Sequence, residues 1–235
     1  MTGFISWFRR NRNTPRHALT ANGRALRVRF SSSAVGLISN YCDPVVNLSL
    51  IQHMTTCGVR RLVYSGPLGI LDDPRELWKL IESGQVRWVY GHAERPRSAP
   101  EVGILPPGSA TIEENGVLFR HFVRQAEEEE PVRFGALQWP PPGGGQRDAI
   151  TATLEGVENR IVVVGSGLEY ERWVWNSVVG RWELYEQNVP GYAETSMVQL
   201  SLDTDQRHVI ISPTSRSSYC SVIDPEANTY TLLMV

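Results

Sequence analysis

The sequence of 235 residues has one lysine, three cysteines and no long apolar run. Three sparse cysteines do not resemble the dense framework of a small secreted domain, so we expect free thiols in a reducing compartment. No stretch of 18 apolar residues is present, and the opening segment lacks the basic start of a secretory signal. We therefore expect a chain that is cytoplasmic or part of an assembled particle, neither secreted nor membrane-spanning.

Acidic residues are absent from residues 1–42, which contain seven arginines; the first carboxylate is Asp43. This part carries a charge of +7 and the remainder carries −9, within a net charge of −2. Such an asymmetry favours an anionic partner, either nucleic acid, an anionic membrane surface or a neighbouring subunit. An Arg-rich, acid-free N-terminus is also typical of a mitochondrial transit peptide, which stays an alternative.

Residues 1–24 are interpreted as a basic aromatic arm. An expected strand follows, in which Leu26, Val28 and Phe30 alternate with arginines, so the charge continues onto the body. The residues predicted to bind an anion or to mediate assembly are Phe4, Trp7, Phe8, Arg9, Arg10, Arg12, Arg16, Arg27 and Arg29. The alternative is that the aromatic part docks into a groove and the arginines only keep it in solution.

Residues 25–91 are predicted to form a small mixed α/β layer, because strand and helix patterns alternate there. One helix is expected from Asp43-Pro44 to Gly58, and a second from the capping box at Asp73 to Gly84. Residues 92–110 are rich in Pro, Arg and Gly and are predicted to be a connection between subdomains.

Residues 111–235 are predicted to form an antiparallel β-rich domain. Asn115-Gly116 is a strong hairpin signal. Further strands are expected at 149–155, 160–165, 170–176, 181–187, 196–202, 207–213, 217–224 and 229–234. The predicted fold is thus α+β and β-dominated, with an antiparallel meander or sandwich after the α/β layer.

An internal echo lies within this region: VWNSVVGRWEL from Val174 aligns without gaps on VIDPEANTYTL from Val222. Asn176 or Asp224 ends the first strand, and an aromatic residue stands on the return strand. Each unit is predicted to be one hairpin.

Trp173 and Trp175 share one face of a predicted strand. Large aromatic residues on one sheet face usually belong to a core. If that face is exposed, the two side chains form a contact surface for a peptide or a glycan.

Cofactor and metal sites are not indicated. Gly165-Ser166-Gly167 follows an apolar strand as a phosphate-binding turn would, but Tyr170 stands where the third glycine belongs. The sequence has no CxxC pair for a metal and no GxSxG motif for a nucleophile. We expect no cofactor, no metal and no small-molecule substrate.

The sequence therefore favours a non-enzymatic structural or assembly subunit, comparable in kind to viral capsid or matrix proteins, which forms a homo-oligomer or a larger assembly. The alternatives are a β-rich module that binds a peptide or glycan, and an enzyme of a type that no motif reveals.

Overall fold

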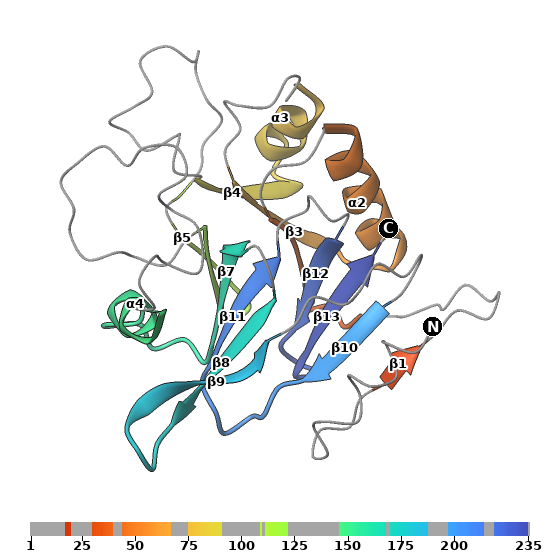
Figure 1. Ribbon diagram of the computed structural model, residues 1–235. Helices are drawn as coiled ribbons and strands as arrows, with labels where there is room; N and C mark the ends of the chain where they lie inside the picture. Colours follow the sequence, from red (N-terminus) through yellow and green to blue (C-terminus); the bar gives the residue numbers. More distant parts are fainter. Residues whose placement is uncertain are drawn as a thin grey trace, which may run out of the picture.

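Two mixed β-sheets form the body of the chain (Figure 1). The computed structural model describes residues 17–19, 30–39, 44–66, 75–90, 109, 111–121, 146–167, 170–187, 197–213 and 219–234. Within these ranges the chain is β-dominated, as predicted, with three helices: α2 (Pro44–Thr56), α3 (Arg75–Glu82) and α4 (Gln146–Thr153).

Among the described residues, sheet A contains seven strands in the order β1-β10-β13-β12-β2-β3-β4. The neighbours β2, β3 and β4 run parallel to one another, and the other pairs are antiparallel. The strands are β1 (His17–Leu19), β2 (Val35–Ser39), β3 (Arg61–Gly66), β4 (Val86–Tyr90), β10 (Met197–Ser201), β12 (Tyr219–Asp224) and β13 (Thr229–Met234).

Sheet B contains six strands in the part of the chain that the structure describes, in the order β5-β6-β7-β11-β8-β9. β7 pairs in parallel with both β6 and β11, while the other pairs are antiparallel. The strands are β5 (Thr111–Glu114), β6 (Val117–Arg120), β7 (Ile161–Gly167), β8 (Glu171–Asn176), β9 (Arg181–Gln187) and β11 (His208–Pro213).

The elements stack in four layers: α2 and α3, sheet A, sheet B and α4. The inter-sheet core draws on both sheets, with Leu37 and Val63 from sheet A and Phe119 and Val163 from sheet B. The outer face of sheet A packs on the helices through a second cluster that includes Met54. Side chains alternate between the two faces of each strand, and the central strands of both sheets carry apolar residues on both faces.

The predicted meander is wrong, because strands that follow one another in the sequence alternate between the two sheets. β10 joins sheet A, β11 returns to sheet B between β7 and β8, and β12 is again in sheet A. Sheet A thereby joins strands from residues 35–90 with strands from residues 197–234.

The strand predicted at 149–155 is also wrong, because this segment belongs to α4. Its Ile and Thr residues favour a strand by composition, but Ile150 and Leu154 are four residues apart. A helix therefore places both on one face, where they are buried against Trp173 and Trp182 of sheet B.

The predicted hairpins are confirmed. Asn115 and Gly116 both have positive φ (51° and 76°), which is the backbone of a type I′ turn between β5 and β6. The two echoed units form the β8–β9 and β12–β13 hairpins, with positive φ at the equivalent Gly180 and Asn228. Among the described helices, none has the length and apolar character to cross a bilayer.

Candidate functional site

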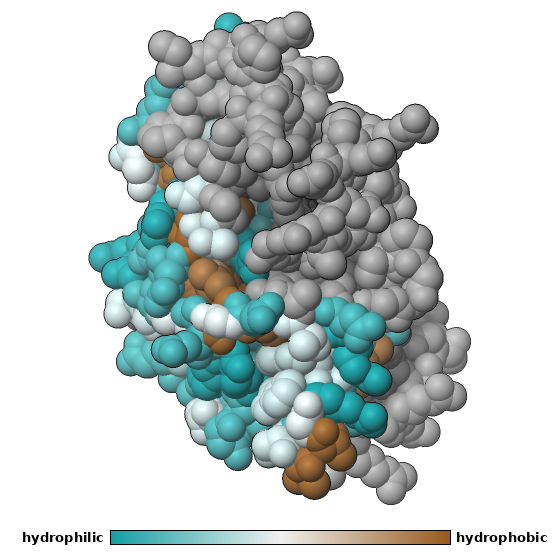
Figure 2. Space-filling model, turned by 90° about the vertical axis from the view of Figure 1, so that its left-hand side faces the viewer, coloured by the Kyte–Doolittle hydropathy of each residue, from teal (hydrophilic) through white to brown (hydrophobic). Residues whose placement is uncertain are grey.

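The β8–β9 hairpin carries the most exposed apolar side chains among the described residues. Val178 and Val179 at its tip are 92% and 51% exposed, and Leu184 and Tyr185 on β9 are 40% and 42% exposed. Hydrophobic surface is visible at the lower end of the face in Figure 2, at the height of this hairpin in Figure 1. Two adjacent valines at a turn leave apolar surface in water without a local reason.

The tip is held by its own backbone and by Asn176. The Asn176 Oδ1 atom accepts hydrogen bonds from the Val178 N–H (3.0 Å) and the Val179 N–H (3.4 Å). The Gly180 N–H donates to the Asn176 carbonyl at 2.9 Å, and Gly180 takes the positive φ that L-residues avoid. The valines are therefore presented on an ordered turn.

Aromatic and arginine side chains support the base of the hairpin on the outer face of sheet B. Trp175 and Trp182 meet edge to face at 5.4 Å between ring centres, and the Arg207 guanidinium lies 5.7 Å from the Trp182 ring centre. Arg147 of α4 donates from Nε to the Trp182 carbonyl at 3.1 Å. These contacts fix the direction in which the hairpin projects.

Glu183 adds a charged patch beside the tip. Hydrogen bonds from Asn176 and Arg181 lower the pKa of the Glu183 carboxyl from its ordinary value. The Asn176 Nδ2–Glu183 Oε2 distance is 2.9 Å, and the Arg181 Nη2–Glu183 Oε1 distance is 3.0 Å. The exposed valines thus stand next to a side-chain cluster that is ionised at neutral pH.

Tyr185 links the exposed hairpin to the interior. The β8–β9 register shifts between Arg172 and Trp173, and the resulting bulge leaves Tyr185 without a direct partner residue on β8. The Arg172 guanidinium lies 4.3 Å from the Tyr185 ring centre. Arg172 is itself buried, donating to the Ser201 carbonyl at 2.7 Å and facing Glu186 at 3.4 Å.

Arg172 belongs to a buried polar seam between the sheets. Its members lie on the inner faces of facing strands and are nearly inaccessible to water: Ser39, Ser65, His121, Tyr170, Arg172, Glu186, Ser212, Ser221 and Tyr230. Facing strands are bridged by the Ser212 Oγ–Ser221 Oγ contact (2.8 Å) and the Ser65 Oγ–His121 Nδ1 contact (3.2 Å). The seam therefore fixes how one sheet is positioned on the other.

One end of the seam lies where parallel strands of both sheets end. A Cβ atom added to Gly165 would lie 2.5 Å from Ser65 Oγ and 3.2 Å from Ser39 Oγ, so only glycine fits there. The Ser39 hydroxyl is buried and has no hydrogen-bond partner among the described residues. The Gly165-Ser166-Gly167 segment is thus a close approach between sheets and not a turn.

Two tyrosines in the seam are held neutral. Burial, followed by the negative charge of Glu186, raises the pKa of Tyr170 well above its ordinary value. Burial also raises the pKa of Tyr230, although hydrogen bonds with Ser212 and Ser221 lower it in part. The two rings stack at 5.4 Å between centres. Both hydroxyls therefore remain protonated donors at physiological pH.

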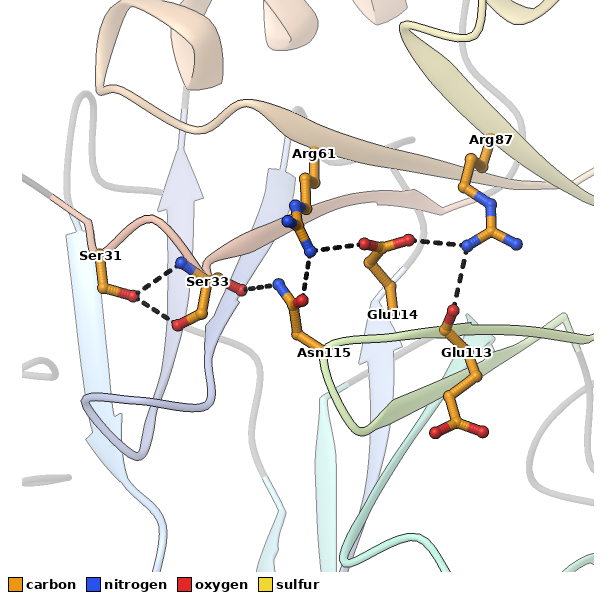
Figure 3. Close-up of polar contacts among 7 residues, drawn as sticks. All are labelled: Ser31, Ser33, Arg61, Arg87, Glu113, Glu114 and Asn115. Carbon is orange, nitrogen blue, oxygen red and sulfur yellow. Dashed lines mark hydrogen bonds and ion pairs between the residues drawn. The ribbon is translucent and has the colours of Figure 1, made fainter.

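At the opposite end of the sheets, a charged clasp joins sheet A to the β5–β6 hairpin (Figure 3). Glu114 accepts from Arg61 and from Arg87, each at 2.7 Å. Asn115 accepts from Arg61 and donates from Nδ2 to the Ser33 carbonyl at 2.6 Å. The two arginines share the one carboxylate of Glu114, so the clasp joins the hairpin to sheet A and keeps a net charge of +1.

Only a few of the residues predicted to form the arm are among those that the structure describes. Residues 1–16 and 20–29 lie outside the described residues, so every predicted contact residue from Phe4 to Arg16, together with Arg27 and Arg29, stays a prediction. His17–Leu19 form β1, which pairs antiparallel with β10 at the edge of sheet A. Residues 17–19 of the predicted arm are therefore attached to the body as a strand.

The predicted tryptophan surface is divided between the core and the base of the hairpin. Trp173 is 4% exposed and donates from Nε1 to Glu171 at 2.9 Å, so it belongs to the core. Trp175 is half-buried and packs on the same cluster. Val178 and Val179 were not among the residues predicted from the sequence, although apolar β-branched residues at turn positions are an unusual signal.

No group of three or more His, Cys, Asp or Glu side chains suited to a metal occurs among the described residues. Cys57 and Cys220 are free thiols, and burial raises the pKa of both.

No protein-family model matches the chain, and neither a curated protein nor a solved structure matches it.

Proposed function

We propose that this chain is a non-enzymatic assembly subunit that associates with copies of itself, with the β8–β9 hairpin as one contact region and the basic arm as another. The observation that carries the proposal is the ordered, exposed Val178-Val179 tip. Apolar surface displayed on a projecting, internally braced turn is suited to burial in a partner.

The charge distribution supports a second copy as the partner. The acid-free N-terminal segment carries +7 and the remainder of the chain carries −9. The basic arm of one copy and the acidic body of the next are therefore complementary, and the attraction is strongest at low ionic strength.

A tip exchange tests the role of the hairpin. The echoed β12–β13 hairpin has Glu226 and Ala227 at the positions of Val178 and Val179, so Val178→Glu with Val179→Ala installs a tip that the chain already tolerates elsewhere. Burial of two valines contributes about 3 kcal/mol, so self-association should weaken roughly 100-fold. Light scattering after size exclusion measures the mass, and an unchanged mass would remove the hairpin from the proposal.

The arm is tested in the full-length chain with Arg9, Arg10, Arg12 and Arg16 changed to glutamine. We expect smaller species than those of the wild type at low salt and no difference at high salt, because salt screens the attraction. A wild-type chain that is monomeric at every salt concentration contradicts self-assembly. Nucleic acid that co-purifies only with the wild type would instead identify the anionic partner of the arm.

A further inference from the structure

The edge of sheet A depends on the N-terminal strand. β1 contributes three residues and pairs only with β10, in the register His17↔Gln199, Ala18↔Val198 and Leu19↔Met197. Without β1, the outer edge of β10 has unpaired backbone groups, and such an edge readily accepts a strand from another chain.

The sequence between β1 and β2 is longer than this position requires. β1 lies four strand positions from β2 in sheet A, which corresponds to roughly 19 Å across the sheet. Phe30 packs on the body and Ser31 is hydrogen-bonded to Asp224, so ten residues, numbers 20–29, lie between β1 and this anchor, with an extended length of roughly 33 Å. The chain length therefore allows β1 to reach a β10 strand outside its own body.

Charge allows β1 to pair with a second body as well as with its own, because every copy carries the same acidic remainder. β1 lies within the N-terminal segment that carries +7, whereas the rest of each copy carries −9. A strand of three residues forms few backbone hydrogen bonds, so its release costs little free energy compared with unfolding of the body. Pairing with a second copy restores the same hydrogen bonds, because the exchanged element is identical.

We propose that β1 is exchanged between copies, so that β1 of one chain pairs with β10 of the next chain in the register seen here. This inference rests on the proposed self-assembly and specifies its geometry. Exchange closes each β10 edge while linking the copies. The hairpin tip at the other sheet then adds apolar contact to the same assembly.

Cysteine trapping in full-length chains tests the exchange. A chain with Ala18→Cys and a differently tagged chain with Val198→Cys are co-expressed, so a disulfide between these positions joins two chains. The pair His17→Cys with Gln199→Cys probes the neighbouring register position. Opposed residues of an antiparallel pair have Cα atoms roughly 4.5–5.5 Å apart, which suits a disulfide.

The matched control pairs Ala18→Cys with Thr229→Cys, a position on β13 that faces Ser201 and not β1. We expect about tenfold more covalent heterodimer from the register pairs than from this control, because pairing holds the thiols at high effective concentration. Circular dichroism of each single variant identifies any variant that fails to fold.

The double variant Ala18→Cys/Val198→Cys separates the two proposals. If only monomers with an internal bridge form, and the register pairs give no more heterodimer than the control, β1 stays on its own chain and the exchange is overturned. Light scattering of the wild type then judges assembly separately. Oligomers without trapped exchange preserve the proposed function, whereas monomers overturn both.

Discussion

The β8–β9 and β12–β13 hairpins have the same turn but different surroundings. In both, an Asn or Asp at the end of the first strand accepts a backbone N–H in the turn, and Gly180 or Asn228 takes a positive φ. β12–β13 lies inside sheet A, between β2 and β10, whereas β9 is the last strand of sheet B. Turn chemistry therefore determines both hairpins, and both tips are exposed. They differ because the β8–β9 tip carries valines on an edge hairpin, whereas the β12–β13 turn is fixed to Ser31 through Asp224.

The two turns differ most in the hydrogen bonds that Asp224 makes outside its own hairpin. Its carboxylate accepts from the Ser31 N–H (2.8 Å), the Ser31 hydroxyl (2.7 Å) and the Ala227 N–H (3.0 Å). We expect Asp224→Ala to lower the free energy of unfolding by about 3 kcal/mol, because charged hydrogen bonds are lost in a buried site. Asn176→Ala should cost about 1 kcal/mol, as for a lost cap. Urea unfolding measures both, and equal losses would contradict the comparison.

The pH dependence gives a check on the Asp224 contribution. Burial raises the pKa of Asp224, but the hydrogen bonds from Ser31 and the nearby backbone lower it by more, so the net shift is downward. Stability from this group is therefore present above the ordinary pKa of about 4 and is lost as pH falls through the lower folded value. The difference between wild type and Asp224→Ala should narrow in that acid range.

Substitution of the positive-φ residue should also cost more stability in the β12–β13 turn than in the β8–β9 turn. Asn228→Ala should cost about 2 kcal/mol, because it strains the backbone and removes the Arg160 Nη2–Asn228 Oδ1 hydrogen bond of 2.6 Å. Gly180→Ala should cost about 1 kcal/mol, since a Cβ atom there meets no neighbour within 4 Å and only the backbone is strained. Thermal unfolding compares them, and a larger loss for Gly180→Ala would reverse the ranking.

Acid should weaken the support of the β8–β9 hairpin through His208 of β11, which faces Val174 of β8. Burial lowers the pKa of His208, the nearby Arg172 and Arg160 lower it further, and the Asp203 carbonyl opposes them. Because the folded pKa is depressed, stability is complete above the unfolded value of about 6.5 and falls as pH drops toward the folded value. The free energy of unfolding of the His208→Gln variant should not show this fall between pH 7.5 and pH 5.5.

The tip exchange should have the smallest effect on stability. Val178→Glu with Val179→Ala should change the free energy of unfolding by less than about 0.5 kcal/mol, because both side chains are exposed. The reverse pair, Glu226→Val with Ala227→Val, places an apolar tip on the β12–β13 hairpin, whose strands have neighbours on both sides. If that variant self-associates more strongly, exposed valines in either turn suffice, and the projection of β8–β9 is not required.

Local structure was predictable where the signal was local. The bounds of β9 and β13 agree with the prediction, and Asn115-Gly116 fixed its turn, since these features depend on period-two alternation and turn residues. Ile150 and Leu154 did not reveal their helix because packing against sheet B outweighs their local preference.

Long-range pairing was not predictable. β11 lies between β7 and β8 and runs parallel to β7, so its position depends on residues far apart in sequence. The internal echo indicates only that each unit is a hairpin. The seam left a faint signal: serine replaces an apolar residue near the ends of the apolar strands β2, β3, β11 and β12. Only the packing of the sheets shows that these hydroxyls meet.

The interleaved order of the strands also affects synthesis. β2 pairs with β12, and both sheets need strands from beyond residue 196, so a ribosome that has released the first 190 residues leaves both sheets incomplete. The edge of the apolar strand β2 therefore stays unpaired until the last strands have been synthesised. Chaperone dependence during translation and aggregation of truncated chains are the expected cellular consequences of a sheet completed by its final hairpin.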